Sequence, residues 1–349
     1  MRLIVQIPCY NEADDLPAVL ASIPRRIPGI DCVEVLVIDD GSTDGTAAVA
    51  RACGADFIVH HAGNRGLAAA FRTGLDHAIR LGADIIVNTD GDNQYPQDAI
   101  PNLIAPILAK KADVVIGDRR PGQAAHFSPT KRWLQRSGAW VVRAVSGTDV
   151  ADPPSGFRAL SREAALRTNV LSSYSYTLET VIQARAAGFW VESVPIEARE
   201  VARPSRLMRS MPHYVAYSGA TIVRAFATYH PLAVFVGIGA PLLVLGLLGI
   251  LRFLFYWITE GGAGHIQSLV LSAALLILGS FVLLFGLLAD QNATNRQLTE
   301  EVLVRLRRLE AEGDSTRAVE EDGASETCSD IETGGSRQGA RGRNSGPRW

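Results

Sequence analysis

Cysteine and net charge are both scarce in this chain of 349 residues. The four cysteines (Cys9, Cys32, Cys53 and Cys328) lie far apart, with no Cys-x-x-Cys pair and no histidines at metal-ligand spacing. This argues against a disulfide framework and favours a reducing, cytoplasmic compartment. The 34 basic and 36 acidic residues nearly cancel, so the chain does not have the basic surplus typical of nucleic-acid-binding proteins.

The sequence also lacks the glycine-rich loops that bind phosphate in two common α/β classes. No Gly-x-Gly-x-x-Gly follows the first apolar segment, and no Gly-x-x-x-x-Gly-Lys-Ser/Thr occurs. These absences argue against dinucleotide-binding and P-loop proteins. The apolar run in residues 1–8 is too short for a signal peptide, and no small-residue cleavage site follows it. We therefore expect the amino-terminal part to stay in the cytoplasm.

Residues 1–203 contain a regular alternation of apolar segments and helical patterns. Such alternation predicts an α/β domain, in which helices cover both faces of a mainly parallel sheet. The predicted strands are 3–7, 33–38, 56–59, 84–88 and 113–116, and the predicted helices are 13–23, 43–53, 66–81 and 97–110.

An acidic segment follows the apolar run 85–87. Asp90, Asp92 and Gln94 occupy alternating positions there, and alternating residues of an extended segment project to the same side. The segment lies beyond the carboxyl end of a strand, where open α/β sheets bind their ligands. Carboxylate and amide oxygens suit Mg²⁺ or Mn²⁺. The alternative is an acidic turn, in which Asp and Asn are common.

Two long uncharged segments predict a membrane hairpin over residues 230–290. Residues 232–251 contain no charge and the apolar character continues to 258, while 268–289 form a second uncharged run of 22 residues. At about 1.5 Å per residue, helices over about 231–258 and 268–289 can each cross a hydrocarbon layer of roughly 30 Å. The alternative is a pair of buried core helices.

Basic residues flank this hairpin on both outer sides, and the connecting segment 259–267 contains no Lys or Arg. The positive-inside rule therefore puts residues 1–203 and both termini in the cytoplasm, on a cell-membrane protein with two spans. The flanking residues are Arg203, Arg206, Arg209 and Arg224 before the first span, and Arg296, Arg305, Arg307 and Arg308 after the second.

The remaining segments have mixed or polar composition. Residues 204–229 predict amphipathic helices at the bilayer surface, with an ordinary helix packed on the domain as the alternative. Residues 291–312 predict a short charged helix that could form a homo-oligomer by self-association. Residues 313–349 are rich in Gly, Ser, Glu and Arg, and we expect a disordered tail there.

Polar loops follow the first two predicted strands and meet the same sheet edge. In residues 8–12 and 39–44, Asp40 is suited to accept hydrogen bonds from a nucleobase, and Tyr10 offers a flat apolar face. Ser42 or Thr43 could also cap the helix that begins near Gly45. Residues 64–66 open the third helix, where Arg65 either meets a phosphate or is solvated.

These segments together resemble those of family 2 glycosyltransferases with the GT-A (Rossmann-like) fold. Segments 8–12, 39–44, 64–66 and 90–94 occur in order and at suitable spacing, and segments 152–158, 177–179 and 191–196 match as well. With the hairpin, residues 1–290 are similar to the dolichyl-phosphate mannose synthase and polyprenyl-phosphate glycosyltransferase branch.

The resemblance implies transfer of a sugar from a GDP- or UDP-linked donor to a polyprenyl (dolichyl-type) phosphate at the bilayer, with inversion, in glycan or protein glycosylation. It implies Mg²⁺ or Mn²⁺ held by Asp92 with Asp90 and Gln94, which stabilises the departing nucleoside diphosphate. The nucleotide-sugar site implied by the family comprises Pro8, Tyr10, Asn11, Glu12, Asp40, Asp90, Gly91, Asp92 and Arg206.

The acceptor phosphate is already ionised near neutral pH, with a second pKa of roughly 6, so the reaction needs no strong general base. Glu179 occupies the helix in which hydroxyl-accepting relatives carry their base. Here it would orient the acceptor or contact the sugar, or else it is a surface carboxylate. The residues expected at the acceptor phosphate are Arg119, Lys131, Arg132, Ser155 and Arg158, with Arg119 and Arg132 favoured for catalysis.

Three other functions compete with this interpretation. A processive polysaccharide synthase normally carries Gln-x-x-Arg-Trp and more spans, whereas Pro129 stands three positions before Arg132 here. A sugar nucleotidyltransferase would need a glycine-rich amino-terminal signature, which is lacking. A non-catalytic membrane scaffold would not need the acidic residues Asp40, Asp90 and Asp92.

Overall fold

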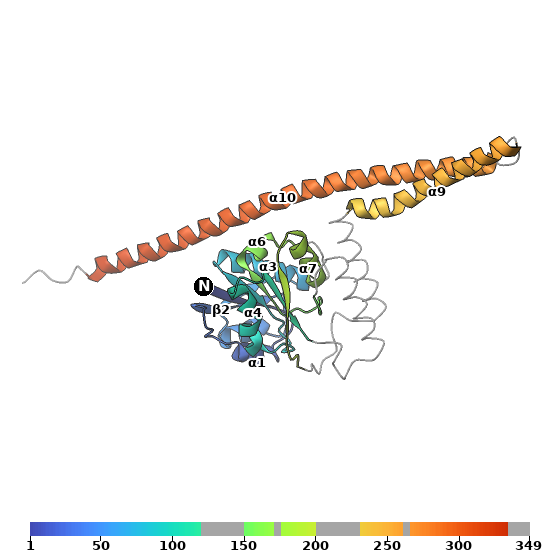
Figure 1. Cartoon of the computed structure of the whole chain (residues 1–349). Helices are drawn as coiled ribbons and strands as arrows, with labels where there is room; N and C mark the ends of the chain where they lie inside the picture. Colours follow the sequence, from blue (N-terminus) through green and yellow to red (C-terminus); the bar gives the residue numbers. More distant parts are fainter. Residues whose placement is uncertain (120–149, 171–175, 200–230, 261–265, 334–349) are drawn as a thin grey trace, which may run out of the picture.

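The computed structural model describes residues 1–119, 150–170, 176–199, 231–260 and 266–333 (Figure 1). A seven-stranded sheet in the order β3-β2-β1-β4-β6-β5-β7 forms the centre of the globular part. Every strand is parallel to the others except β6, which is antiparallel to β4 and β5. The predicted mainly parallel α/β sheet is therefore confirmed. The strands are β1 Arg2–Cys9, β2 Cys32–Asp39, β3 Phe57–His60, β4 Ile85–Asn88, β5 Val114–Asp118, β6 Arg158–Ser161 and β7 Val191–Pro195.

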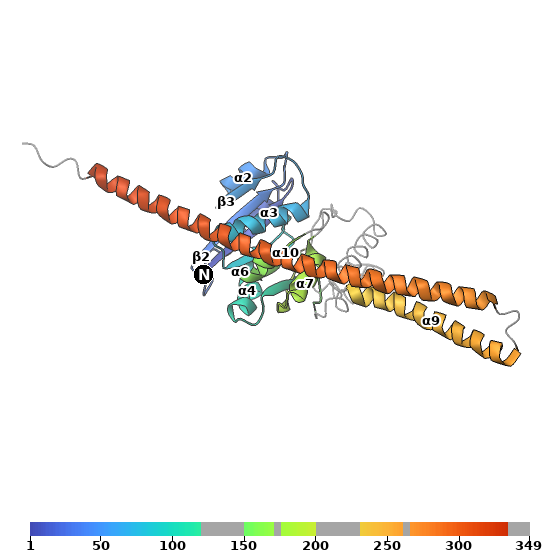
Figure 2. The same cartoon turned by 90° about the horizontal axis from the view of Figure 1, so that it is seen from above.

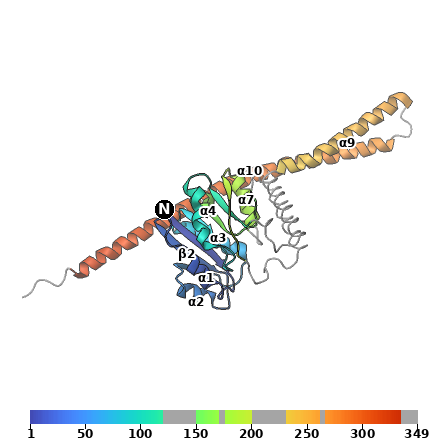
Figure 3. The same cartoon turned by 60° about the horizontal axis from the view of Figure 1, so that its bottom comes forward.

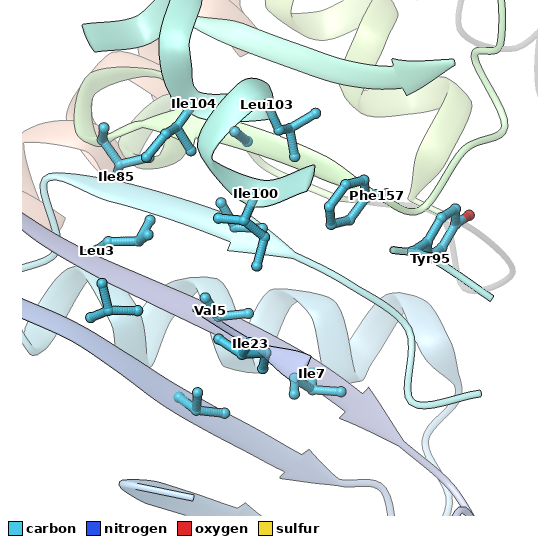
Figure 4. Packing of buried hydrophobic residues seen from close by; sticks show 14 of the residues in the cluster. Leu3, Val5, Ile7, Ile23, Ile85, Tyr95, Ile100, Leu103, Ile104 and Phe157 are labelled. Carbon is cyan, nitrogen blue, oxygen red and sulfur yellow. The ribbon is translucent and has the colours of Figure 1, made fainter. Parts of the chain in front are cut away.

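Helices cover both faces of the sheet. On one face, side chains of α1, α2 and α4 join Leu3, Val5 and Ile7 in a buried apolar cluster (Figures 3 and 4). On the other face, α3, α6 and α7 pack in a second cluster around Ile4 and Ile86. The helices are α1 Leu16–Ser22, α2 Thr46–Ala52, α3 Leu67–Arg80, the 3₁₀ turn η1 Gln97–Ala99, α4 Ile100–Leu108, α6 Arg162–Arg167 and α7 Thr177–Ala186.

The antiparallel strand β6 has no counterpart among the predicted strands. It is only four residues long and begins with Arg158, so its sequence carries little apolar periodicity. Its direction matters for function. Because β6 runs against β4, the preceding residues 150–157 lie at the carboxyl ends of β4 and β5.

Two long helices follow the globular part. Helix α9 spans Pro231–Glu260 and helix α10 spans Ile266–Thr333, and both contain segments long and apolar enough to cross a membrane. Glycines allow their close approach, since a Cβ at Gly246 would lie 2.8 Å from Leu276 Cγ and one at Gly286 would lie 2.6 Å from Phe235 Cβ. The predicted hairpin thus pairs its two helices directly (Figures 1 and 2).

Helix α10 does not end where the second predicted span ends. It continues without a break through residues 291–312 and on to Thr333, into the segment predicted to be disordered, while 334–349 lie outside the described residues. Adding residues to an existing helix needs no new nucleus, so helical structure can extend into a polar sequence that would not form a helix alone. One helix therefore runs through the second predicted span, the predicted short helix and the first part of the predicted tail.

The charged part of α10 packs on the globular part of the chain, over α3 and α6 (Figure 2). Val304 is buried in the same apolar cluster as α3 and α6. Arg307 donates hydrogen bonds of 3.0 Å to the carbonyl oxygens of Leu166 and Thr168 and pairs with Asp76 at 3.2 Å. This face of α10 is an intramolecular interface, a role that the sequence did not indicate.

The register of this interface fixes the direction of the hairpin. Arg307 meets Asp76 and Glu310 meets Arg80, so α10 and α3 run in the same direction. Helix α3 connects the parallel strands β3 and β4 and thus runs from the carboxyl edge of the sheet back to its amino edge. The hairpin end of α10 therefore projects on the side of the carboxyl edge, away from the amino terminus (Figure 1).

Replacing Arg307 with alanine is expected to release α10 from the domain. The variant loses charge-assisted hydrogen bonds in a part-buried interface, at about 2 kcal/mol. Hydrogen–deuterium exchange of residues 300–310 should accelerate by roughly 30-fold, while the sheet stays protected. Arg305→Ala is the matched control, because Arg305 is 75% exposed and pairs only weakly with Glu301 on the same helix. Equal exchange in both variants would contradict the docking contact.

Candidate functional site

The polar segments singled out in the sequence meet at the carboxyl edge of the sheet. The loops after β1, β2, β4 and β5 and the segment before β6 all reach this edge. Gly91 illustrates how closely they pack, since a Cβ there would lie 3.0 Å from Cys9 Sγ and 3.3 Å from Glu12 Cγ. The structure therefore brings residues 8–12 and 90–92 into contact, and Pro8 is buried as part of β1.

Asp90 lies in an unusual position for a carboxylate. Its Oδ1 is buried and accepts no hydrogen bond from the described residues. Gly156 makes room for it, because a Cβ there would lie 2.8 Å from Asp90 Oδ2. Burial raises the pKa of Asp90 to about 7, and the negative charge of Asp92 adds to this rise, while Arg119 and Arg158 oppose it. A buried carboxylate oxygen beside a second carboxylate is neutralised by a proton or by a bound cation.

Asp92 and Gln94 follow Asp90 in the turn after β4, and both are half-exposed. Asp92 Oδ1 accepts a 3.1 Å hydrogen bond from the backbone N–H of Gln94, and this bond holds the turn after β4. Among the described residues no group of three Asp, Glu, His or Cys side chains is arranged to hold a metal ion. The donor set of two carboxylates and an amide oxygen still fits Mg²⁺ or Mn²⁺, which usually keep several waters or substrate phosphates as ligands. The metal assignment stays a prediction that this chemistry supports.

The raised pKa of Asp90 predicts a pH-dependent response to metal. Because the pKa of Asp90 is higher in the folded state than in the unfolded state, the folded state binds its proton more tightly. In the metal-free protein this stabilisation is fully present below the unfolded pKa of 3.8 and is lost as the pH rises through about 7. A divalent cation takes the place of the proton, so the rise in Tm caused by Mn²⁺ should be larger at about pH 7.5 than at about pH 5.5. Thermal unfolding with and without Mn²⁺ measures this, and Asp90→Asn should remove most of the pH dependence. A metal effect of equal size at both pH values would contradict it.

Arg119 and Asp152 form a part-buried ion pair beside this site, in which the carboxylate is the buried partner. Arg119 Nε and Nη2 lie 2.7 Å and 3.0 Å from the two carboxylate oxygens of Asp152, which is 1% exposed. The guanidinium carbon of Arg119 also lies 6.0 Å from the centre of the Tyr95 ring. Tyr95 in turn accepts a 2.9 Å hydrogen bond from the Gly156 amide and stacks on Phe157 (Figure 4). Arg119 is 21% exposed, so part of it remains available to a ligand.

Arg158 and Ser155 do not lie at an exposed surface. Arg158 is 1% exposed, and its guanidinium donates to main-chain carbonyls of Pro153, Ser155 and Thr177 and to the Thr180 hydroxyl. Ser155 is fully buried. These positions correct the expectation that both residues meet an acceptor phosphate: Arg158 instead holds the turn before β6 against α7, and its sequence motif did not distinguish the two roles.

The loops after β1 and β2 are joined by hydrogen bonds. The backbone N–H of Asn11 donates to Ser42 Oγ at 2.9 Å, and the side-chain Oδ1 of Asn11 accepts from the backbone N–H of Thr43 at 2.8 Å. The Glu12 amide donates to Thr46 Oγ1 at 3.0 Å. Neither Ser42 nor Thr43 caps α2, whose first residue follows Gly45 with no side-chain cap. The predicted cap is therefore wrong, and both residues instead fix the loop of residues 8–12. Tyr10 is 37% exposed at this edge.

Asp40 is held by groups that the sequence did not reveal. Its Oδ1 accepts from the Arg65 amide at 2.9 Å and lies 2.6 Å from His61 Nδ1, while Oδ2 accepts from the Gly66 amide at 2.8 Å. Gly66 is the residue before α3 and has a φ of 90°, a left-handed value that favours glycine. Asp40 therefore binds the start of α3, and His61 is a buried member of the site that no motif indicated.

The remaining predicted site residues fall into two groups. Glu179 lies half-buried in the first turn of α7, and the Arg65 side chain is exposed. Lys131, Arg132 and Arg206 lie outside the described residues, as do the predicted amphipathic segment 204–229 and most of the loop between the spans.

Comparisons with known proteins agree with the sheet and its edge. The family described as Glycosyl transferase family 2 matches residues 4–167. Polyprenol monophosphomannose synthase of Mycolicibacterium smegmatis is 31% identical over 210 residues, which cover 57% of this chain and 78% of that protein. Undecaprenyl-phosphate mannosyltransferase of Micrococcus luteus is 29% identical over 206 residues, which cover 56% of this chain and 83% of that protein.

Solved structures share the fold. Glucosyl-3-phosphoglycerate synthase of Mycobacterium tuberculosis, in complex with phosphoglyceric acid, superposes with a TM-score of 0.51 at 22% identity, covering 65% of this chain and 79% of that one. A second structure of that synthase, with a TM-score of 0.50, contains Mn²⁺, UDP-glucose and phosphoglyceric acid. At this identity the likeness establishes the GT-A-like fold.

Proposed function

We propose, from the premise that this chain belongs to glycosyl transferase family 2, that it moves a sugar from a nucleoside diphosphate to a polyprenyl phosphate in a membrane. One observation carries the proposal. The two carboxylates Asp90 and Asp92 converge at a sheet edge on the side toward which the apolar hairpin projects. This arrangement suits a polar donor and a lipid acceptor that meet at one site.

The donor half of the reaction rests on the acidic edge. Asp92, Asp90 and Gln94 would hold Mg²⁺ or Mn²⁺, which when bound neutralises the charge that develops on the departing diphosphate. Tyr10, with its exposed ring, can stack on the base, and Asp40 can accept a hydrogen bond from it. A relative with the same fold has been solved with Mn²⁺ and UDP-glucose, which supports a metal-dependent nucleotide-sugar donor.

The acceptor half needs a cation rather than a base. A lipid phosphate is already ionised near neutral pH and can attack without losing a further proton. Arg119 is partly exposed and is held rigidly by Asp152 and Tyr95, so it can orient the phosphate. Glu179, at the start of α7, is proposed to orient the sugar or the acceptor. Lys131, Arg132 and Arg206 remain proposals for the acceptor and the diphosphate on sequence grounds.

The hairpin is proposed to span the membrane with the domain on the cytoplasmic side, as the flanking arginines indicate. About 27 Å of helix separate Ala289 from Arg307, and about 14 Å of α3 separate Asp76 from the carboxyl edge. The edge would then lie roughly 13 Å from the end of the second span, within reach of a phosphate at the headgroup level. The names of both relatives favour a polyprenyl phosphate acceptor over a growing polysaccharide.

Transfer into lipid tests this function directly. Membranes containing the protein are incubated with labelled UDP- and GDP-sugars, beginning with nucleotide-linked mannose because both relatives are named for it. Organic extraction and thin-layer chromatography should show label in a polyprenyl-phosphate sugar, and chelation of divalent cations should abolish it. Label that stays in the aqueous phase with every donor would refute the proposal.

A further inference from the structure

Two adjacent histidines at the end of β3 each contact an aspartate at the end of β2. His60 Nδ1 lies 2.9 Å from Asp39 Oδ2, and His61 Nδ1 lies 2.6 Å from Asp40 Oδ1. Successive residues of a strand face opposite ways, and the environments differ accordingly. The His60 side chain is 57% exposed, whereas the His61 side chain is 5% exposed.

Both ring nitrogens of His61 have a partner. An ionised carboxylate can only accept, so Nδ1 carries the proton and donates to Asp40. Nε2 lies 3.0 Å from Thr73 Oγ1, a hydroxyl on α3 that can donate to it. The ring is thereby fixed between the end of β2 and the body of α3, with a single orientation that satisfies both contacts.

This contact determines how Asp40 can meet a ligand. Oδ1 is occupied by His61 and the Arg65 amide, while among the described residues Oδ2 accepts only from the Gly66 amide. The Asp40 side chain is 4% exposed, so little of it is open to a ligand. Oδ2 is the oxygen with room for a further hydrogen bond, and a rotation of the carboxylate would change the direction of its remaining lone pair.

We propose that His61 is a positioning residue for the nucleobase: it holds Asp40 so that Oδ2 faces a base with a ring N–H, as in uracil or guanine. The inference rests on the proposed function, since it assumes that the donor is a nucleoside diphosphate sugar. It assigns His61 no contact with substrate and no part in the transfer step.

Binding of nucleotide and of pyrophosphate separates the possible roles of His61. In the presence of Mn²⁺, His61→Phe should weaken binding of UDP or GDP by about 10- to 100-fold, the effect of one lost charge-assisted hydrogen bond. It should leave binding of inorganic pyrophosphate unchanged, because pyrophosphate has no base. In turnover, the donor KM should rise by a similar factor while kcat stays within about threefold.

Two further variants control the experiment. His61→Asn places an amide N–H near the position of Nδ1 and should restore most of the nucleotide affinity. His60→Phe changes the neighbouring, exposed histidine and should leave binding of both ligands as in the unmodified protein. If His61→Phe does not fold, His61→Asn and a Thr73→Val variant, which should weaken nucleotide binding severalfold, still test the contact.

Other results would refute either the role of His61 or the proposed function. Equal losses for nucleotide and pyrophosphate, or a lower kcat with unchanged KM, would make His61 a general structural residue and refute the inference. Unchanged nucleotide binding in His61→Phe would refute it as well. If the unmodified protein bound neither UDP nor GDP, the proposed function would fall together with the inference.

Discussion

Replacing Asp92 with alanine should reduce sugar transfer by about 10²- to 10³-fold, the usual effect of removing one electrostatic contact to a transition state. Asp92 and Asp90 are both half-exposed, and Asp90 has a buried Oδ1 that accepts no hydrogen bond from the described residues. In the proposed mechanism, loss of Asp92 removes one of the two carboxylates that would hold a divalent cation against the departing diphosphate. The loss should appear mainly in kcat, because the charge develops as the bond to the sugar breaks.

Two comparisons make this result specific. Asp98→Ala removes an exposed carboxylate of η1, close in sequence but outside the site, and should transfer sugar at the original rate. Titration with Mn²⁺ in the presence of UDP or GDP should show weakened metal-dependent binding in Asp92→Ala alone. Undiminished transfer by this variant would remove Asp92 from the mechanism.

Replacing Asp152 with alanine should destabilise the catalytic domain by about 3 kcal/mol. The change leaves the Arg119 guanidinium largely buried beside Tyr95 without the carboxylate that binds it at 2.7 Å and 3.0 Å. Breaking one side of a buried pair costs far more than the pair contributes, because the other charge stays behind. Orientation of Arg119 toward an acceptor should be lost at the same time.

Urea unfolding of the detergent-solubilised protein, followed by near-ultraviolet circular dichroism, measures this cost. The matched control is Glu301→Ala, which breaks the exposed pair with Arg305 on α10 and should cost about 0.5 kcal/mol or less. Asp152→Asn keeps an acceptor oxygen and should fall between the two. A midpoint for Asp152→Ala equal to that of the control would show that the pair does not hold this part of the fold.

Local patterns in the sequence predicted much of the sheet and the acidic edge. The strands β1, β2, β4 and β5 are apolar runs with clear ends, and the polar residues that follow them necessarily meet where parallel strands end. The position of Asp90 and Asp92 could be predicted for this reason. Their electrostatics could not, because Asp90 packs against Gly156 and lies near the charges of Arg119 and Arg158, all from distant segments.

Features that depend on contacts between distant segments could not be predicted from the sequence. The sequence predicts Arg158 at the acceptor phosphate, because its motif does not reveal that β6 carries it into the interior. The continuation of α10 and its packing on α3 join residues more than 200 positions apart, which no local periodicity reports. His61 was missed for the same reason, since its role depends on Asp40 and Thr73 from two other elements.

The unbroken course of α10 has a mechanical consequence. If α9 and the first part of α10 span the bilayer as proposed, a change in bilayer thickness that tilts these helices would also reorient the domain that Arg307 holds against α10. Acyl-chain length in reconstituted vesicles would then set how closely the reaction centre approaches the headgroups, and with it the turnover of long-chain substrates.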